Sequence, residues 1–300
     1  MRIGFGVPVS GSWATPANML RVARRAEELG YDSLWTFQRL LYPVGHPMGS
    51  VYRSVQDPLI TLAYLAGVTE RARLGVAVLN MPFFSPALLA KQLATLQQVS
   101  GGRLEAGLGL GWLPEEFVAS GVPMRARGRR AVEYLQVLRR FWQDDIVSHK
   151  GEFYEVAPSH QDPKPSPVPV LLGGTAEVAL RRAGELADGW ISSSRADLAA
   201  IDDQIYIVKD AARAAGRDPE ALRFVCRGVT RVRQAGQDDR APLTGSLEEI
   251  RADVAALAAT GVTELFHDLN FDPEIGDPEA DPAASMRRAE EALEALAPGA

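Results

Sequence analysis

Glycines at alternate positions end a short apolar stretch and give this chain a place where a ligand could rest. The stretch runs from Arg103-Leu104 to Trp112, with glycine at positions 107, 109 and 111. In a strand, this spacing leaves bare backbone, which suits either a barrel corner or the close approach of a flat ligand. The dinucleotide fingerprint needs its third glycine three positions after the second, at a helix start. We therefore reject a Rossmann motif and keep both other interpretations open.

A second glycine turn, Gly173-Gly174-Thr175, follows the apolar run 168–172 and precedes a helix expected over 176–184. Backbone N–H groups at such a helix start bind phosphate readily. The alternative is a tight turn with Thr175 as the helix N-cap, and spacing alone favours neither. The next strand ends in Ser192-Ser193-Ser194, which could complete the same site or cap a helix beginning near Asp197.

Four arginines gather at the start of the helix expected over 129–142, where the helix dipole disfavours cations. They are Arg125, Arg127, Arg129 and Arg130. Either acidic neighbours pair with them or an anionic ligand does, and we favour ion pairing. The acidic candidates are Glu115, Glu116 and Glu133.

Histidines and nucleophile motifs give little evidence for a catalytic or metal site. The four histidines lie far apart at 46, 149, 160 and 267, and none has a partner at metal-ligand spacing, so we expect no metal site. His267 lies at the tip of a predicted strand and is either a polar group of a barrel mouth or a structural histidine. The sequence contains no Gly-x-Ser-x-Gly elbow and no P-loop.

Strand-like and helix-like segments alternate along the whole chain and would position these residues. The apolar runs resemble strands buried on both faces of a parallel sheet, over 2–8, 32–37, 73–79, 103–109, 168–172, 188–193, 222–229 and 263–269. Helix starts carry a capping side chain before proline, at Thr15-Pro16, Asp57-Pro58, Ser85-Pro86 and Asp281-Pro282, and Ser246 begins a capping box.

Eight such units predict an α/β fold, a (β/α)8 TIM barrel in one domain over 1–300, with an open doubly wound sheet as the competitor. The segments 146–149 and 152–156 predict a hairpin inserted before the fifth strand. Long connections follow the strand ends, and in a barrel those loops build the active site.

Composition narrows the class of partner. The net charge is −6, with 46% hydrophobic and 23% charged residues, and the charges are spread along the chain, which argues against nucleic acid or a membrane surface as partner. The single cysteine, Cys226, lies in an apolar run and is expected to fill the core. We expect a cytoplasmic protein, since neither a signal peptide nor an apolar run of membrane-spanning length is found.

Taken in order, five segments resemble the bacterial luciferase-like superfamily, and more narrowly its branch that uses the deazaflavin coenzyme F420. They are Leu34-Trp35-Thr36-Phe37-Gln38-Arg39-Leu40, Leu74-Gly75-Val76-Ala77-Val78-Leu79-Asn80, Pro86-Ala87-Leu88-Leu89-Ala90-Lys91-Gln92, the stretch from Ser100 to Trp112, and Gly173-Gly174. The resemblance implies a barrel that holds F420, or alternatively FMN, at its C-terminal mouth, usually in a homodimer.

The resemblance also assigns residues. It implies a bulged third strand with a non-proline cis peptide at Ala77-Val78 that supports the ring. Asn80 then contacts the ring, as does the backbone of Leu110 and Gly111, and Gly173 and Gly174 hold the phosphate. Thr175 and Ser192 would complete that phosphate site.

Two departures from the family pattern bear on the reaction. Where many members have an acidic residue and a histidine, this chain has Gln38-Arg39, and where the sugar-phosphate dehydrogenases have a glutamate, it has Trp112. An arginine stays protonated and cannot act as an ordinary general acid or base. We expect Arg39, with Gln38 beside it, to hold an anionic or carbonyl substrate, and Trp112 to wall the pocket.

The expected function is therefore an oxidoreductase that moves a hydride between F420 and a small organic substrate. The alternatives are a reduced-FMN-dependent monooxygenase of the luciferase type and a non-catalytic flavin-binding or storage protein. Because the cofactor supplies the hydride chemistry, its identity decides the reaction class.

Overall fold

The computed structural model describes residues 1–299 and shows a closed barrel of eight parallel strands. Neighbouring strands follow the order β1-β12-β9-β8-β7-β4-β3-β2, which confirms the predicted TIM barrel and excludes the open doubly wound sheet. All eight strands lie within two residues of the predicted bounds. They are β1 Arg2–Gly6, β2 Ser33–Thr36, β3 Arg73–Asn80, β4 Leu104–Gly109, β7 Val170–Gly173, β8 Gly189–Ile191, β9 Arg223–Val229 and β12 Glu264–Asp268.

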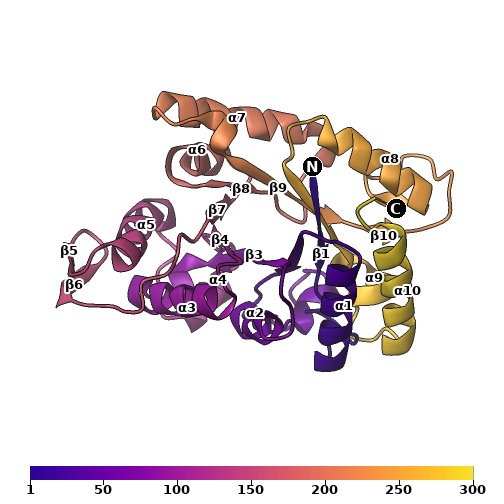
Figure 1. Cartoon of the computed structure of the whole chain (residues 1–300), viewed down its shortest axis with the longest axis horizontal. Coiled ribbons are helices and arrows are strands. Elements are labelled where there is room, and N and C mark those ends of the chain that lie inside the picture. The colour runs from indigo at the N-terminus through magenta and orange to yellow at the C-terminus, as the bar shows by residue number, and fades with distance from the viewer. Residues whose placement is uncertain (300) are drawn as a thin grey trace.

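Helices cover the outside of the barrel, as Figure 1 shows. They are α1 Pro16–Glu28, α2 Pro58–Ala66, α3 Pro86–Val99, α4 Pro114–Ala119, α5 Arg127–Gln143, α6 Glu177–Leu186, α7 Ile201–Ala214, α8 Leu247–Ala258, α9 Pro273–Gly276 and α10 Pro282–Ala295. The predicted caps are confirmed, since the side chains of Thr15, Asp57, Ser85 and Asp281 each accept from a backbone N–H, and Ser246 and Glu249 form the capping box. No helix within residues 1–299 has the length and apolar character needed to cross a membrane.

The interior of the barrel is filled with side chains. Trp35 and Phe266 stack with 5.0 Å between ring centroids, inside a buried apolar cluster that also contains Ala77, Leu171 and Val225. Nearer the N-terminal ends of the strands, the carboxylates of Glu105 and Glu264 pair with the guanidinium groups of Arg73 and Arg223. These layers close the barrel below, so a ligand has room above them, at the C-terminal mouth.

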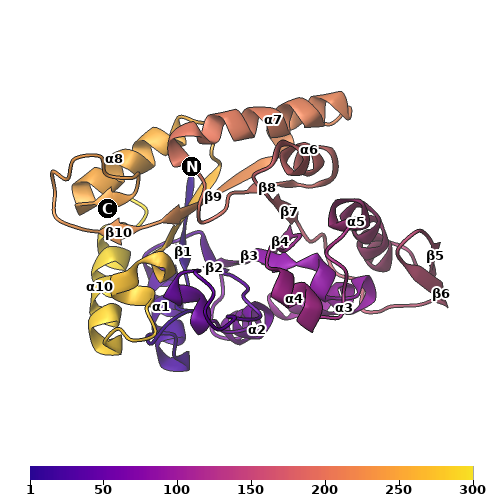
Figure 2. The same ribbon diagram turned by 180° about the vertical axis from the view of Figure 1, so that it is seen from behind.

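A hairpin interrupts the barrel before its fifth strand, as predicted. β5 (Val147–Lys150) and β6 (Glu155–Ser159) pair antiparallel, and both views show them projecting beyond α5 (Figures 1 and 2). The loop after β9 contains a further small pair that the sequence did not predict, β10 (Arg231–Val232) and β11 (Thr244–Gly245).

The third barrel strand carries the irregularity that the resemblance implies. Its pairing with β4 shifts register between Val76 and Leu79, and the peptide bond between Ala77 and Val78 is cis. This bulge lies at the C-terminal mouth of the barrel.

Candidate functional site

One cavity of about 930 Å³ lies over the C-terminal ends of the strands. All of the site residues predicted from the sequence line it, although they come from five different strands and the loops that follow them. They are Gln38, Arg39, Ala77, Val78, Asn80, Leu110, Gly111, Trp112, Gly173, Gly174, Thr175 and Ser192. The fold therefore brings the candidate ring-contacting and phosphate-contacting residues to one place.

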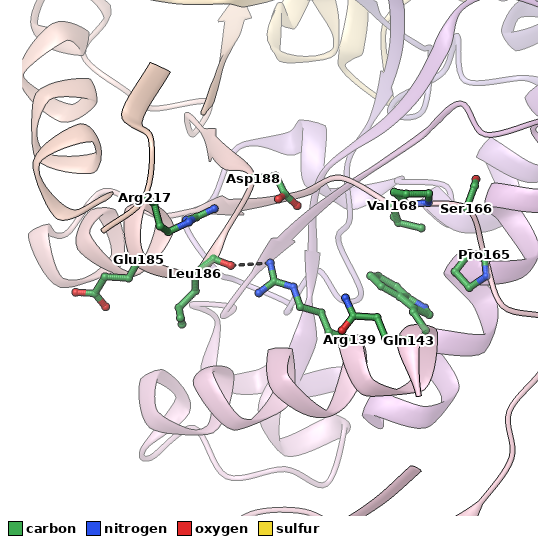
Figure 3. Close-up of a pocket in the computed structure, with 11 residues that line it drawn as sticks. Arg139, Gln143, Pro165, Ser166, Val168, Glu185, Leu186, Asp188 and Arg217 are labelled. Atoms are coloured by element: carbon green, nitrogen blue, oxygen red, sulfur yellow. Dashed lines mark hydrogen bonds between the residues drawn. The ribbon is translucent and has the colours of Figure 1, made fainter. Parts of the chain in front are cut away.

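A second cavity, of about 560 Å³, lies near the N-terminal ends of β7 and β8 and is shown in Figure 3. Arg139 from α5 donates a hydrogen bond to the carbonyl of Leu186, and Arg217 donates to the carbonyls of Gly184 and Ala187. Both cations therefore stabilise the C-terminal end of α6, where the helix dipole favours positive charge. The two arginines of this cavity therefore have a structural role, and we assign no ligand to it.

The alternating glycines of β4 make room for the bulged strand beside them. A Cβ on Gly107 would collide with the backbone carbonyl of Val76, and one on Gly109 would lie 2.5 Å from Cγ2 of Val78. Gly173 meets the same side chain, with 3.1 Å from a built Cβ to Cγ1 of Val78. The glycines thus allow another group to approach the backbone closely, as one of the two interpretations held. At Gly109 and Gly173 the approaching group is the side chain of Val78. The side chain of Val78 therefore lies beside Gly109 and Gly173, and the groups on which a flat ring would rest stay a prediction.

The Gly173-Gly174 turn joins β7 to α6. Gly174 has φ +147, a conformation that favours glycine, and the indole Nε1 of Trp190 donates to its carbonyl at 2.9 Å. The alternative interpretation, in which Thr175 caps the helix, is wrong, because α6 begins at Glu177 with Ala176 as N-cap and no side-chain cap. The first N–H groups of α6 therefore keep their capacity to bind an anion beside the cavity.

The serines after β8 serve the neighbouring strand and turn. Ser192 is buried, and its Oγ accepts a hydrogen bond from the backbone N–H of Arg227 at 2.9 Å. Ser193 accepts from the N–H of Arg195, and Asp197 caps the short helix Leu198–Ala200. Capping by the serines is thus excluded for the helix near Asp197, while all three serines line the cavity.

Four arginine side chains on the rim of the cavity have neither a hydrogen bond nor an ion pair within residues 1–299. We call Arg125, Arg127, Arg182 and Arg195 the rim arginines. Nη2 of Arg182 lies against Gly128, in the first turn of α5, and burial lowers the pKa of this guanidinium. The N-cap of α5, Ala126, offers no side-chain cap, so this helix start also leaves N–H groups for an anion.

Of the four clustered arginines, Arg129 is the one that forms the favoured ion pair within residues 1–299, and its partner is not among the expected carboxylates. Arg129 pairs with Glu152 at 2.7 Å, and Arg130 donates to the carbonyl of Pro123 and lies over the ring of Phe153. The carboxylates that we expected as partners are used elsewhere. Glu133 accepts from the backbone of Phe153 and Tyr154, and Glu116 pairs with Arg39.

Arg39 and Glu116 form a buried ion pair on the β2 side of the cavity. Their side chains are 5% and 0% exposed, with 2.9 Å between Nη1 and Oε2. The guanidinium lies between the rings of Tyr52 and Trp112, 4.8 and 4.7 Å from their centroids. Beside it, Oε1 of Gln38 accepts from the N–H of Asn80 at 2.8 Å and ties β2 to the bulge of β3. The charge of Arg39 is thus matched within the protein.

Sequence reasoning missed Arg227, on β9. Its Nε donates to Asp268 at 2.7 Å, its Nη1 donates to the carbonyl of Ala77 at 2.9 Å, and its side chain is 7% exposed. The rings of Phe37 and Phe271 enclose the guanidinium, with centroids 4.7 and 4.5 Å from Cζ. The signal was the position of Arg227 inside the apolar run 222–229, because an arginine is almost never fully buried without a partner.

His267 and Cys226 belong to the structure around the barrel. His267 is 1% exposed, its Nδ1 shares a hydrogen bond with Thr230 Oγ1 at 2.9 Å, and burial lowers its pKa to about 4. It is absent from the described cavity lining, so the structural interpretation holds. Cys226 is buried, and burial raises the pKa of its thiol to about 12. Within residues 1–299, no three His, Cys, Asp or Glu side chains gather as a metal site would require.

Comparison with known proteins places this barrel in a family. An uncharacterized protein of Mycobacterium tuberculosis (strain ATCC 25618 / H37Rv) is 34% identical over 287 residues, 86% of this chain and 98% of its own. An F420-dependent glucose-6-phosphate dehydrogenase of Amycolatopsis mediterranei (strain U-32) is 31% identical over 221 residues, 72% of this chain and 65% of its own. An FMNH(2)-dependent dimethylsulfone monooxygenase of Pseudomonas putida is 30% identical over 238 residues, 77% of this chain and 62% of its own.

The family model for luciferase-like monooxygenases matches residues 3–241, which include β1 to β9 and therefore most of the strands that form the cavity. The resemblance inferred from the sequence is confirmed: this chain belongs to the luciferase-like monooxygenase family.

Proposed function

We propose that this protein is an oxidoreductase that moves a hydride between coenzyme F420 and a small, neutral organic substrate at the C-terminal mouth of its barrel. The observation that carries the proposal is that one cavity combines a cationic rim with a charge-balanced interior. On the rim, four arginines have no hydrogen-bond or ion-pair partner within residues 1–299, and two helix starts have no side-chain cap. In the interior, carboxylates neutralise the arginines.

The rim suits an anionic cofactor tail. The rim arginines and the uncapped starts of α5 and α6 offer four guanidinium groups and two sets of backbone N–H groups. Of the acidic residues, Asp197 lines the described cavity, and it caps a short helix. F420 carries glutamate carboxylates beyond its phosphate, whereas FMN ends at the phosphate, so this rim favours F420.

The remaining predicted residues would hold the ring and the phosphate. Ala77 and Val78 would support one face of the ring, Asn80, Leu110 and Gly111 would contact its edge, and Gly173 and Gly174 with the start of α6 would hold the phosphate. Bound there, the cofactor supplies the hydride chemistry. The chain's own part is to orient ring and substrate and to exclude water, with Trp112 as a wall.

The cavity offers few side chains for proton transfer. The described lining contains no His, Cys, Lys or Glu side chain, its arginines stay protonated, and its ionisable groups besides the arginines are Asp197, which caps a short helix, and Tyr52, which lies against Arg39. Gln38 and Arg39 would therefore position the substrate. Gln38 would act indirectly, because it fixes the bulge of β3, and Arg39 would line the substrate pocket together with Trp112.

A reduced-FMN-dependent monooxygenase is the second candidate, and one observation favours it. The dimethylsulfone monooxygenase relative is nearly as similar to this chain as the F420-dependent relative, at 30% against 31% identity. The charge on the rim decides our preference, since four unpaired guanidinium groups exceed what a single phosphate needs.

Fluorescence titration of the purified protein with each cofactor tests the proposal. We expect F420 to be quenched on binding at micromolar concentration and FMN to bind at least about tenfold more weakly. Binding of FMN without F420 would replace the first candidate by the second. Turnover of bound F420 against a panel of small ketones and alcohols separates an enzyme from a storage protein.

A homodimer and a cytoplasmic location stay predictions. The resemblance implies the dimer, and light scattering of the purified protein tests it. Fractionation of cells that express the full chain tests the location.

A further inference from the structure

Arg227 has one hydrogen-bonding group that the protein does not use. Nε is bound to Asp268 and Nη1 to the carbonyl of Ala77, whereas Nη2 is buried and has no partner within residues 1–299. An arginine head held by two partners and two aromatic rings cannot turn to find another. A buried donor left without an acceptor costs free energy, so the unused Nη2 of Arg227 needs an explanation, and an acceptor on a bound ligand supplies one.

Arg227 lines the cavity on the side that the proposed cofactor leaves open. The candidate cofactor residues come from β3, β4, β7 and β8 and the loops after them. Phe37, Gln38, Arg39 and Tyr52 follow β2, and Arg227 lies on β9, which stands directly across the barrel from β3. We call these five residues the β2–β9 compartment. The inference rests on the proposed function in this respect, because it assigns the compartment to the substrate.

The charge of the compartment is already balanced. The guanidinium of Arg227 pairs with Asp268 and that of Arg39 with Glu116, and in each pair both side chains are less than one-tenth exposed. A substrate carboxylate would therefore meet a neutral ion pair and would lose its hydration without a free cation in return. A carbonyl or hydroxyl oxygen needs only a donor, and Nη2 supplies one.

We infer that Arg227 is a specificity-determining residue whose Nη2 donates a hydrogen bond to a neutral substrate oxygen, a ketone or a hydroxyl group, and that Asp268 excludes carboxylates by neutralising it. The same bond places the substrate near Ala77, because Nη1 of the same planar group holds the carbonyl of Ala77. Arg227 transfers no proton.

The test compares two ring compounds of similar size, cyclohexanone and cyclohexanecarboxylate, on protein loaded with whichever cofactor binds. Ligand-observed NMR titration gives the dissociation constants, and ¹³C-labelled cyclohexanone reports the hydrogen bond through the shift of its bound carbonyl carbon. We expect the ketone to bind at least about tenfold more tightly than the carboxylate.

Two variants separate recognition from structure. In Arg227→Lys the charge beside Asp268 remains but the planar fork is lost, so ketone affinity should fall about tenfold and the carbonyl shift should move toward its value in water. In Asp268→Asn the guanidinium becomes uncompensated, so carboxylate affinity should rise about tenfold or more. The control is Arg233→Lys, because Arg233 pairs with Asp272 at 2.6 Å and is absent from the described lining, and it should change neither affinity.

Equal binding of both probes by the wild type, no binding of either at millimolar concentration, or unchanged ketone affinity in Arg227→Lys would overturn the inference. Failure of the proposed function looks different. Neither F420 nor FMN would then bind the wild-type protein, and the same comparison of probes on the unloaded protein would still decide the role of Arg227.

Discussion

At the scale of residues, buried ion pairs fix the shape of the candidate substrate compartment. Glu116 accepts from the backbone N–H groups of Leu40 and Leu41 and pairs with Arg39, so one carboxylate holds both the loop after β2 and a side chain of the cavity. Removing one partner of such a pair leaves an uncompensated buried charge, which costs more than the pair contributes to stability.

Glu116→Gln tests that assignment. We expect the free energy of unfolding to fall by about 3–5 kcal/mol, because the guanidinium of Arg39 would stay buried without its counter-charge. Urea denaturation followed by circular dichroism measures it. Glu115→Gln is the matched control, since Glu115 is exposed and has no ion pair within residues 1–299. Equal loss in both variants would contradict the account.

His267 predicts a pH dependence of stability. Burial lowers its folded-state pKa to about 4, whereas the unfolded chain binds a proton near pH 6.5. The unfolded state therefore binds more protons between these values, and stability present above pH 6.5 is lost as the pH falls toward 4, by about 3 kcal/mol in all.

Urea unfolding from pH 4 to pH 7.5 measures this slope. His267→Gln should flatten the profile between pH 4 and 6.5, and His160→Gln, at an exposed histidine, should leave it unchanged. The same slope in wild type and His267→Gln would show that other groups control it.

At the scale of elements, the bulge of β3 and the glycines of β4 and β7 form one unit. Val78 occupies the space that side chains at 109 and 173 would fill, and the backbone of Val76 occupies the space at 107. The bulge thus fits against β4 and β7, the two strands that follow β3 on one side of the barrel.

Two alanine substitutions test the backbone contact and the side-chain contact of this unit separately. Gly107→Ala meets backbone that cannot move aside and should destabilise the fold by about 1–3 kcal/mol or more. Gly109→Ala meets the side chain of Val78 and should weaken cofactor binding about tenfold with a smaller loss of stability. Thermal unfolding and fluorescence titration give both quantities. Gly67→Ala, with 3.7 Å to its nearest neighbour, is the control, and cofactor affinity unchanged by Gly109→Ala would contradict the role of Val78.

Local patterns were enough to predict the barrel, because each strand is an apolar run and half of the described α-helices start at a capping residue and a proline. They also predicted the hairpin and located the cavity, since strand ends converge in a barrel. They could not predict the ion pairs that decide its chemistry. Arg227 contacts Ala77, which is 150 positions away, and Glu116 contacts Leu40 across 76 positions, and no local spacing encodes such contacts.

At the scale of the whole molecule, charge is distributed unevenly. The chain carries a net charge of −6, yet the rim arginines make the mouth of its cavity cationic. A confined positive field on an acidic protein concentrates anions at one place and makes their binding sensitive to salt.

The double variant Arg125→Gln/Arg182→Gln tests this field. We expect its affinity for F420 to fall about tenfold at low ionic strength, with a smaller difference at high salt, because screening already weakens the wild-type contacts. Fluorescence titration at two salt concentrations measures both. Arg129→Gln is the control, since Arg129 is paired with Glu152 and lies outside the described lining. An equal effect of both would show that the field is not local.

The central claim is that this cavity holds a deazaflavin ring together with an anionic tail, and side-by-side dissociation constants for F420, its tail-free deazaflavin fragment and FMN test it most directly. The account predicts that F420 binds most tightly, that the fragment binds more weakly, and that this gap narrows as salt is added. If FMN binds more tightly than F420, or if the fragment binds as well as the whole cofactor, the account is contradicted.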